Sequence, residues 1–278
     1  MGILKVDASI QPFLGIDPFE TITTLKGETV RDKEGRRTFK VRLGNKNYFI
    51  KYHRGIGWKE IAKDLAQLRF PIISAYNEYL AITKLQQLGV STTNPVAIGV
   101  RGINPARTES FLVTEAIENA VTLEDLTKVW PNESPNLKFK RALIEEVATI
   151  ARMLHDHGMN HRDFYLCHFR IDSKTASNQD SKNISLSLMD LHRAQIREKV
   201  PSRWLIKDLG ALLFSAAHIG LSRTDIFRFI AHYRQGSPSK ELRKNERFWN
   251  AVYQRANKFH LRDWKQPMPL LIQRTKQG

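Results

Sequence analysis

The chain has 278 residues, of which 41% are hydrophobic and 26% charged, so it is long enough to bury one large core or two smaller ones. Lysine and arginine number 44 against 28 aspartate and glutamate, which gives a formal net charge of +16. This excess predicts a negatively charged partner: a nucleic acid, an anionic membrane or glycolipid, or nucleotide phosphates. The single cysteine, Cys167, excludes an internal disulfide framework and is typical of a reducing cytoplasm.

No apolar run reaches the roughly 18–20 residues that a membrane-spanning helix needs. The longest candidate, Leu209 to Leu221, is typical of a buried helix. The N-terminus contains neither the apolar core of a signal peptide nor the serine or threonine of a myristoylation motif. We therefore expect a cytoplasmic protein.

The first third of the chain alternates β-favouring segments with turn residues. We expect strands over Thr21–Arg31, Arg37–Leu43, Tyr48–Tyr52, about Pro95–Val100 and Ser110–Glu115. Two helices are expected between the third and fourth strands, over roughly Trp58–Leu68 and Ile73–Leu88, and Gly89 ends the second. These elements predict a five-stranded sheet with a helix on it.

After Ile117 the pattern becomes mostly helical. Thr122 and Asp125 form a capping box, and apolar residues recur with a helical period from Leu137 to His157. A hairpin is expected over Phe169–Ile171 and Ile184–Met189, and helices near Arg203–Ile219, Arg223–Tyr233 and Lys240–Lys258. We predict an α+β fold of two lobes, a β-rich lobe at residues 1–117 and a mostly helical lobe at residues 118–278.

A His-Arg-Asp motif, His161-Arg162-Asp163, follows the predicted helix end at Gly158, and His168 comes five residues after Asp163. A second aspartate, Asp190, ends an apolar strand. Protein kinases have a His-Arg-Asp loop followed by a strand that ends in a metal-binding aspartate. In phosphoryl transfer one carboxylate accepts the proton of the attacking hydroxyl and another holds Mg²⁺. The context indicates a kinase-like phosphotransferase.

The first lobe contains the other two residues that such a kinase needs, a lysine on the third strand and a glutamate on the next helix. Lys51 ends the segment Tyr48-Phe49-Ile50-Lys51. Glu78 precedes Ala81, Ile82 and Leu85 at helical spacing, so it lies on the inward face, where a carboxylate is costly unless a cation meets it. Lys51 is the expected partner, and Glu60, which is nearer in sequence, is the alternative to Glu78.

Four segments resemble the lipopolysaccharide core heptose(I) kinases of the WaaP type. They are His161-Arg162-Asp163-Phe164-Tyr165-Leu166-Cys167-His168-Phe169, Met189-Asp190-Leu191-His192-Arg193-Ala194-Gln195, Ile50-Lys51-Tyr52-His53-Arg54-Gly55-Ile56-Gly57-Trp58 and Val113-Thr114-Glu115. The similarity extends from about Asp17 to past residue 230. It implies a protein-kinase-like bilobal fold, with one main helix in the β-rich lobe, and transfer of phosphate from ATP to an inner-core heptose hydroxyl of lipopolysaccharide.

The resemblance also implies a role for individual residues. Lys51 is expected to contact the α- and β-phosphates of ATP, with Glu78 holding it and Glu115 as a further residue of the nucleotide site. Asp190, with His168 as a candidate second ligand, is expected to bind Mg²⁺. Asp163 is expected to orient and deprotonate the sugar hydroxyl.

The chain departs from the protein-kinase pattern in several places. Its first hairpin lacks Gly-x-Gly-x-x-Gly, so Arg36 and Arg37 either contact phosphate or belong to a solvated hairpin tip. His168 replaces the asparagine that binds the second metal ion, and a neutral imidazole can also bind a divalent metal. Leu191-His192 replaces Phe-Gly, and no Ala-Pro-Glu follows, which disfavours a protein substrate. Asp208 is expected to brace the catalytic loop.

Two segments carry most of the positive charge. Lysine and arginine number 11 against 3 acidic residues over Arg31–Lys63, and 10 against 3 over Lys240–Lys276. They are either a solvated surface or a docking surface for the lipopolysaccharide core and the anionic cytoplasmic face of the inner membrane. The amphipathic segment Trp58–Ile73 either packs in its lobe, lies on lipid or receives an acyl chain. A lipid or an acyl-bearing, acidic protein is therefore a further expected partner.

Several rival readings are less favoured. A zinc site among the histidines of residues 155–168 has no tight ligand pair to support it, and Cys167 is most simply a small hydrophobe. A kinase for another lipopolysaccharide sugar, such as Kdo or a second heptose, or for a small soluble sugar, stays open. We expect no nucleic-acid partner, because aromatic residues are not interleaved with the basic runs and no groove-reading motif is present.

Overall fold

The computed structural model describes residues 2–33, 35–66 and 73–268. The chain divides into two compact units. The N-terminal unit consists of Met1–Gln87, Thr92–Glu118 and Asp190–Arg193, and the C-terminal unit of Leu88–Ser91, Asn119–Met189 and Ala194–Gly278. The boundary expected at residue 117 is therefore crossed twice: Leu88–Ser91 belongs to the C-terminal unit, and Asp190–Arg193 belongs to the N-terminal unit. A nucleotide-binding role for residues 1–117 and a catalytic role for 118–278 stay predictions.

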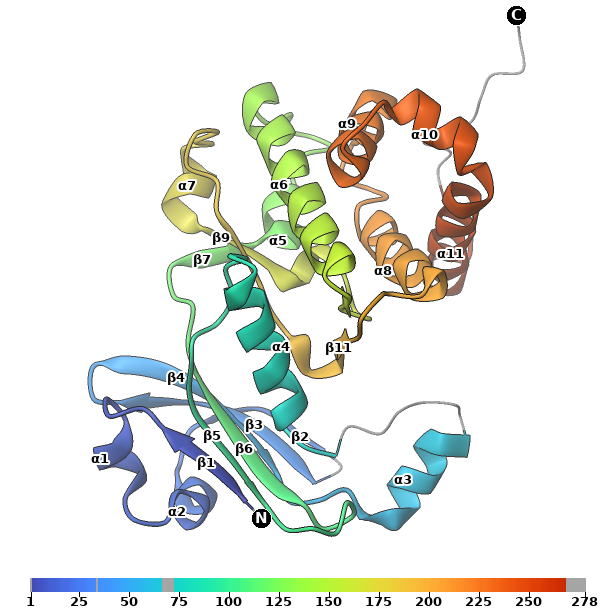
Figure 1. The fold of residues 1–278 in the computed structure, drawn as a ribbon. Coiled ribbons are helices and arrows are strands. Elements are labelled where there is room, and N and C mark those ends of the chain that lie inside the picture. The colour runs from blue at the N-terminus through green and yellow to red at the C-terminus, as the bar shows by residue number, and fades with distance from the viewer. Residues whose placement is uncertain (1, 34, 67–72, 269–278) are drawn as a thin grey trace, which may run out of the picture. The chain divides into compact units, whose positions relative to one another are not determined.

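The N-terminal unit is built on an antiparallel sheet of six strands in the order β1-β5-β6-β4-β3-β2 (Figure 1). The strands are β1 (Ile3–Val6), β2 (Glu28–Lys33), β3 (Arg36–Leu43), β4 (Lys46–His53), β5 (Pro95–Arg101) and β6 (Glu109–Glu115). The helices are α1 (Gln11–Leu14), α2 (Pro18–Thr24), α3 (Gly57–Ala66) and α4 (Tyr76–Gln87), with a 3-10 turn at Leu191–Arg193. The sheet has one strand more than the five expected, because β1 pairs with β5.

The expected strand at Thr21–Arg31 is wrong over its first half. The β-branched run of Thr21, Ile22, Thr23 and Thr24 favours a strand, but it lies in α2. The Asp17 side chain accepts hydrogen bonds from the amides of Phe19 and Glu20, and a proline stands in the first turn. This N-cap outweighs the β-propensity, so the strand begins only at Glu28.

One hydrophobic core cluster of this unit lies on the face of the sheet opposite to Lys51. Phe39, Ile50 and Phe111 are fully buried in it. Because side chains alternate along a strand, burial of Ile50 turns its neighbour Lys51 to the opposite face. A Cβ atom at Gly99 would lie 2.3 Å from the Phe111 ring, so only glycine permits this approach of β5 to the ring.

Helix α4 buries Glu78, Ala81, Ile82 and Leu85, the face that the sequence predicts. In α3, Ile61 is buried, whereas Trp58 and Leu65 are 62% and 54% exposed. Of the expected helix Trp58–Leu68, the last two residues lie outside the described residues. Contact of this segment with lipid or an acyl chain stays a prediction.

The C-terminal unit is mostly helical (Figure 1). Its helices are α5 (Leu123–Thr127), α6 (Leu137–Asp156), α7 (Ser173–Ser177), α8 (Ser202–Ser215), α9 (Arg223–Arg234), α10 (Pro238–Lys244) and α11 (Glu246–Trp264), with a 3-10 turn at Leu166–His168. Its short strands are β7 (Ala120–Thr122), β8 (Met159–Asn160), β9 (Phe169–Asp172), β10 (Leu186–Leu188) and β11 (Gln195–Ile196). Within the described ranges, no helix combines the length and the apolar character needed to cross a membrane.

Two expected elements of this unit are corrected. The single helix expected at Lys240–Lys258 is two helices, α10 and α11, that meet at Asn245. The Asn245 side chain donates to Glu241, which also accepts from the indole of Trp249, and these bonds hold the break. The polar turn of the hairpin contains α7, capped by Asp172.

Candidate active site

Lys51 and Glu78 form the ion pair that the sequence predicts. Lys51 Nζ lies 2.6 Å and 2.9 Å from the two carboxylate oxygens of Glu78, which is buried. Burial opposes the charge on Lys51, but the carboxylates of Glu78 and Asp190 outweigh it and raise the pKa of Lys51. Glu60, the alternative partner, instead binds Lys63 at 2.8 Å.

Asp190 belongs to the same unit and completes this cluster. Its Oδ1 lies 3.4 Å from Lys51 Nζ and 2.6 Å from His192 Nδ1. The backbone carbonyl of His192 accepts a hydrogen bond from the Asn77 side chain, so α4 holds the turn after Asp190 as well as Glu78. Asp190 has a φ of 58°, in the left-handed region, where a non-glycine residue costs about 1–3 kcal/mol and is often functional.

The His-Arg-Asp loop lies in the C-terminal unit, and Asp208 holds its backbone. The carboxylate of Asp208 is fully buried and accepts the amides of His161 at 2.6 Å and Arg162 at 2.8 Å. Arg162 has a φ of 75°. Asp208 therefore fixes the backbone immediately before Asp163, and the bracing role expected for it is confirmed.

The other side of the loop is fixed by two histidines. His161 Nε2 donates to the carbonyl of Met189 at 2.9 Å, and the amide of Met189 donates to the carbonyl of His168. His168 Nδ1 lies 2.6 Å from the carbonyl oxygen of Asp163, so this nitrogen carries the hydrogen. A neutral His168 then has its lone pair on Nε2, which is the form that can ligate a metal.

The remaining expected residues lie elsewhere in the N-terminal unit. The Glu115 carboxylate binds Lys46 at 2.6 Å and Asn94 at 3.0 Å, and these hydrogen bonds lower the pKa of Glu115. Arg36 and Arg37 are half-buried, and the Arg37 guanidinium lies 4.2 Å from the centre of the Phe39 ring. Glu115 thus binds Lys46 and Asn94, and the Arg37 guanidinium donates to the carbonyl of Leu25, rather than contacting the pair of Lys51 and Glu78.

The residues present fit a magnesium ion bound with a nucleotide. Mg²⁺ in kinases takes one or two protein carboxylates, the phosphates and water. Asp190 supplies a carboxylate whose side chain is 39% exposed. Within the described ranges, no group of three or more histidine, cysteine or acidic side chains is arranged to hold a metal by itself. A site completed by phosphate oxygens matches this donor set.

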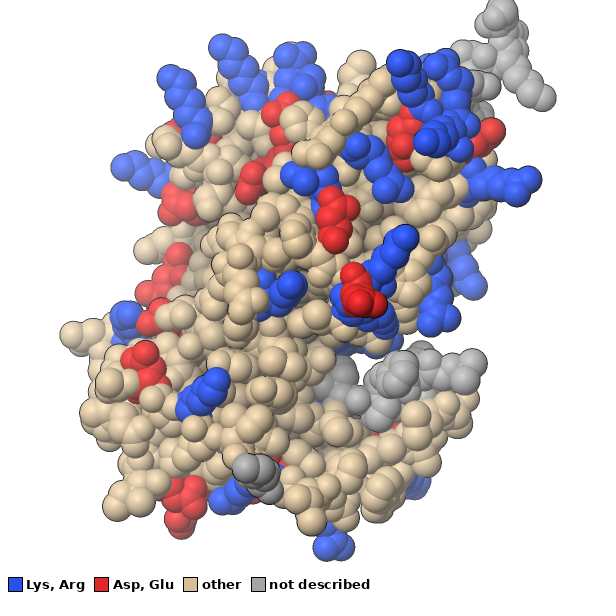
Figure 2. All heavy atoms as spheres, in the orientation of Figure 1, with Lys and Arg blue, Asp and Glu red and all other residues tan. Residues whose placement is uncertain are grey.

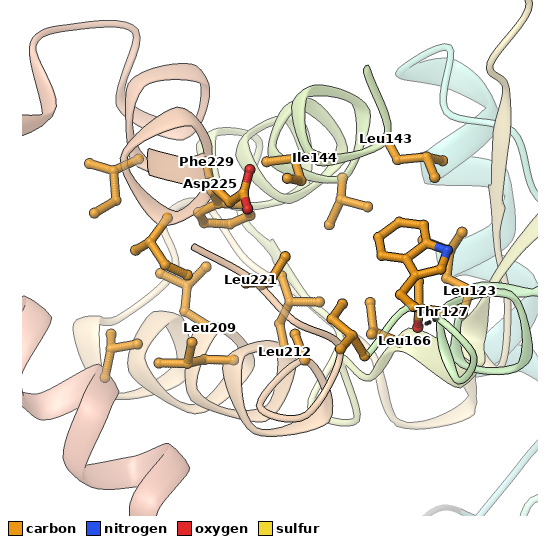
Figure 3. Close-up of a pocket in the computed structure, with 18 of the residues that line it drawn as sticks. Leu123, Thr127, Leu143, Ile144, Leu166, Leu209, Leu212, Leu221, Asp225 and Phe229 are labelled. Carbon is orange, nitrogen blue, oxygen red and sulfur yellow. Dashed lines mark hydrogen bonds between the residues drawn. The ribbon is translucent and has the colours of Figure 1, made fainter. Parts of the chain in front are cut away.

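An apolar cavity of about 110 Å³ lies within the C-terminal unit (Figure 3). Leu143 and Ile144 of α6, Leu209 and Leu212 of α8, and Phe229 of α9 point into it. Two polar side chains at its wall have partners: Thr127 Oγ1 donates to the Leu123 carbonyl, and Asp225 binds Lys140 at 2.7 Å. The cavity is therefore suited to a hydrocarbon.

The model of the lipopolysaccharide kinase (Kdo/WaaP) family matches residues 20–233. The chain belongs to this family. Two curated members are both described as lipopolysaccharide core heptose(I) kinase WaaP. The one from Pseudomonas aeruginosa is 44% identical over 84% of this chain and 85% of its own length. The one from Escherichia coli K12 is 42% identical over 82% and 85%.

A solved structure, described as WaaP in complex with acyl carrier protein, is 36% identical to this Kdo/WaaP family member. The alignment covers 93% of this chain and 99% of the other, with a TM-score of 0.79. The expected α+β, protein-kinase-like fold with a β-rich and a helical part is confirmed.

Sequence reasoning missed two supporting residues of this Kdo/WaaP family kinase. His192 binds Asp190, and Asn77 binds the backbone of His192. His192 stands two positions after Asp190, where it could have been noticed as a candidate partner. Asn77 carries no such signal, because its contact depends on how the turn after Asp190 meets α4.

Proposed function

We propose that this chain transfers the γ-phosphate of ATP to a hydroxyl group of a heptose in the inner core of lipopolysaccharide. The observation that carries the proposal is the cluster of Lys51, Glu78 and Asp190, in a member of a family whose named relatives are heptose(I) kinases. A kinase needs this lysine for the phosphates, this glutamate to hold the lysine, and an aspartate for the metal.

We assign each residue one role in the reaction. Lys51 binds the α- and β-phosphates, and Glu78 keeps its ammonium group in place. Asp190 and His168 hold Mg²⁺, which when bound neutralises the phosphate oxygens. Asp163 orients the acceptor hydroxyl and removes its proton, a contribution of about 10²–10⁴ in rate. Glu115 is proposed to line the nucleotide site.

Labelled ATP and core lipopolysaccharide that lacks the heptose phosphate test this function, with the variant Asp163→Ala beside the wild type. We expect transfer by the wild type, and ATP binding without turnover by the variant. Transfer to Kdo, to a second heptose or to a small soluble sugar in place of the first heptose would favour a related sugar kinase. Salt-dependent binding of random DNA duplexes without ATP turnover would favour a nucleic-acid-binding protein.

We also propose that the chain binds an acyl-bearing carrier protein and that the apolar cavity takes its acyl chain. A solved relative is in complex with acyl carrier protein. An empty cavity of about 110 Å³ costs about 3 kcal/mol, which an acyl chain would recover. Binding to acylated carrier protein, and much weaker binding to the unacylated form, would support this proposal; equal binding would contradict it.

The basic surface is proposed to hold the anionic glycolipid at the cytoplasmic face of the inner membrane. Figure 2 shows lysine and arginine side chains over α10 and α11. The exposed cationic residues of these two helices are Lys240, Arg243, Lys244, Arg247, Lys258 and Arg262. Such a surface attracts anionic lipid and loses this attraction at high salt. Sedimentation with anionic vesicles, compared with neutral ones, tests it.

A further inference from the structure

Four cationic side chains surround the ring of Trp204 in the C-terminal unit. The guanidinium carbons of Arg162, Arg197 and Arg203 lie 5.1, 5.8 and 5.5 Å from the ring centre, and Lys207 Nζ lies 5.3 Å from it. An indole ring attracts each cation by its face, but the four cations repel one another. We call these five residues the Trp204 cluster.

No described carboxylate balances the positive charge of two of these residues. Arg197 donates to Asn160 Oδ1 and Gln195 Oε1, both at 2.6 Å, and both oxygens are uncharged. Arg203 is exposed and contacts the Trp204 ring. Neither arginine forms an ion pair with any described acidic residue. Burial and the charge of Arg203 lower the pKa of Arg197, a shift that a nearby anion would oppose.

The cluster lies beside the proposed catalytic residue. Trp204 and Asp208 are four residues apart in α8 and therefore share a face of that helix. Asp208 binds the amides of His161 and Arg162, and Arg162 directly precedes Asp163. One turn of α8 thus separates Asp208, which holds the catalytic loop, from Trp204 of the Trp204 cluster.

We propose that the Trp204 cluster is an acceptor subsite, which binds an oxyanion, a carboxylate or a phosphate, carried by the acceptor saccharide next to the reacting hydroxyl. The inference rests on the proposed function and adds the substrate feature that this kinase recognises. Guanidinium groups bind carboxylate and phosphate oxygens through paired hydrogen bonds, and arginine remains charged at every physiological pH. An anion held here would fix the sugar ring relative to Asp163 and so select acidic acceptors over neutral sugars.

Two variants, Arg203→Gln and Arg197→Gln, test the subsite in steady-state phosphate transfer. The acceptors are core lipopolysaccharide that lacks the heptose phosphate, the same material with its carboxylates methyl-esterified, and the same material after phosphatase treatment. We expect each variant to raise KM for the untreated acceptor about tenfold or more, with kcat and KM for ATP close to wild type. Arg141→Gln, which removes an exposed arginine of α6, is the matched control with unchanged KM.

The treated acceptors identify the anion. The treatment that removes the bound group raises the wild-type KM to that of the variants and abolishes the difference between them. The proposal is overturned if the variants keep the wild-type KM, if neither treatment removes the difference, or if the variants raise KM for ATP instead. Absence of transfer by the wild type to every acceptor would contradict the proposed function itself.

A binding measurement without turnover distinguishes a failure of the proposed subsite from a failure of the proposed function. Inorganic sulfate is the probe: we expect it to raise the melting temperature of the wild type and of R141Q by more than that of R203Q or R197Q. The general effect of sulfate on folded proteins is common to all four and cancels in this comparison. Equal stabilisation of all four proteins would overturn the subsite even if transfer is observed. The melting temperature without sulfate reports whether each variant is folded.

Discussion

Lys51 and Glu78 are separated by 27 positions in the chain, yet the lysine Nζ lies 2.6 Å from a carboxylate that is only 6% exposed. The pair connects the end of β4 to α4. A buried carboxylate that lost this cation would keep its desolvation cost without the compensating interaction. The pair is therefore both a structural link of the N-terminal unit and the proposed phosphate site.

The first prediction concerns this pair. Glu78→Gln keeps the shape of the side chain but removes the charge that holds Lys51, so we expect kcat/KM for ATP to fall by about 10–100-fold. We expect the free energy of unfolding to fall by about 1–3 kcal/mol. Glu60→Gln is the control, because Glu60 binds Lys63 on α3. A larger loss of activity in E60Q than in E78Q would assign the role to Glu60.

The second prediction concerns Asp190. Asp190→Asn removes a negative charge from the proposed metal ligand. We expect the Mg²⁺ concentration for half-maximal activity to rise by about tenfold or more, because mutation even of the groups that hydrogen-bond to metal ligands typically lowers metal affinity about 10–100-fold. Titration of activity with Mg²⁺ at saturating ATP measures this. Asp180→Asn, in an exposed turn, is the control. An unchanged Mg²⁺ dependence of D190N would remove Asp190 from the site.

The third prediction concerns the brace of the catalytic loop. Asp208→Ala leaves two buried amides, those of His161 and Arg162, without their acceptor, at a cost of about 1–3 kcal/mol each. We expect lower stability in urea and a lower kcat at temperatures where the variant is folded. Asp172→Ala removes an aspartate that accepts the amide of Thr175 at the start of α7, and we expect it to reduce stability only. Equal kcat values for both folded variants would show that catalysis does not depend on this brace.

The pairing of Lys51 with Glu78 could be predicted because two local sequence patterns determine it, the alternation of side chains in a strand and the repeat of a helix. Alternation in β4 places Ile50 in the core and Lys51 on the other face, and the helical repeat of α4 places Glu78 with Ala81 and Ile82. Both patterns are read within a few residues of sequence.

Elements that depend on distant contacts could not be predicted in this way. The sequence of β1 has no strong alternation of apolar and polar residues. This strand forms because Ile3 to Val6 pair with β5, more than 90 residues away. The start of α2 is a local case instead, in which one capping aspartate outweighs four β-branched residues. The Trp204 cluster combines Arg162, Arg197 and residues of α8, and no linear motif contains all of them.

The fourth prediction concerns the apolar cavity. Ala216→Leu adds three carbon atoms to its wall, and we expect the free energy of unfolding of the isolated protein to rise by about 1–2 kcal/mol. Acylated carrier protein is expected to raise the melting temperature of the wild type by mass action and to raise that of A216L much less. Ala142→Leu on α6, outside the cavity, should respond like the wild type. A full response of A216L to the acylated partner would place the acyl chain elsewhere.

The fifth prediction is a pH dependence of stability that originates at His53, the last residue of β4. This side chain is buried, its Nδ1 has no hydrogen-bond partner among the described residues, and its cross-strand neighbour is Arg36. Burial, and then the charges of Arg36, Lys51 and His192, lower the pKa of His53 from 6.5 to about 3.

The sign follows from the protons bound in each state. Above pH 6.5 the imidazole is neutral in both the folded and the unfolded chain, and its full contribution to stability is present. Between pH 6.5 and about 3 only the unfolded chain binds the proton, so the free energy of unfolding falls by about 1.4 kcal/mol for each pH unit. Urea unfolding of the wild type and His53→Gln at pH 7.5, 6.0 and 5.0 measures it. We expect a shallower slope for H53Q, whereas parallel slopes would show that His53 is protonated in the folded protein.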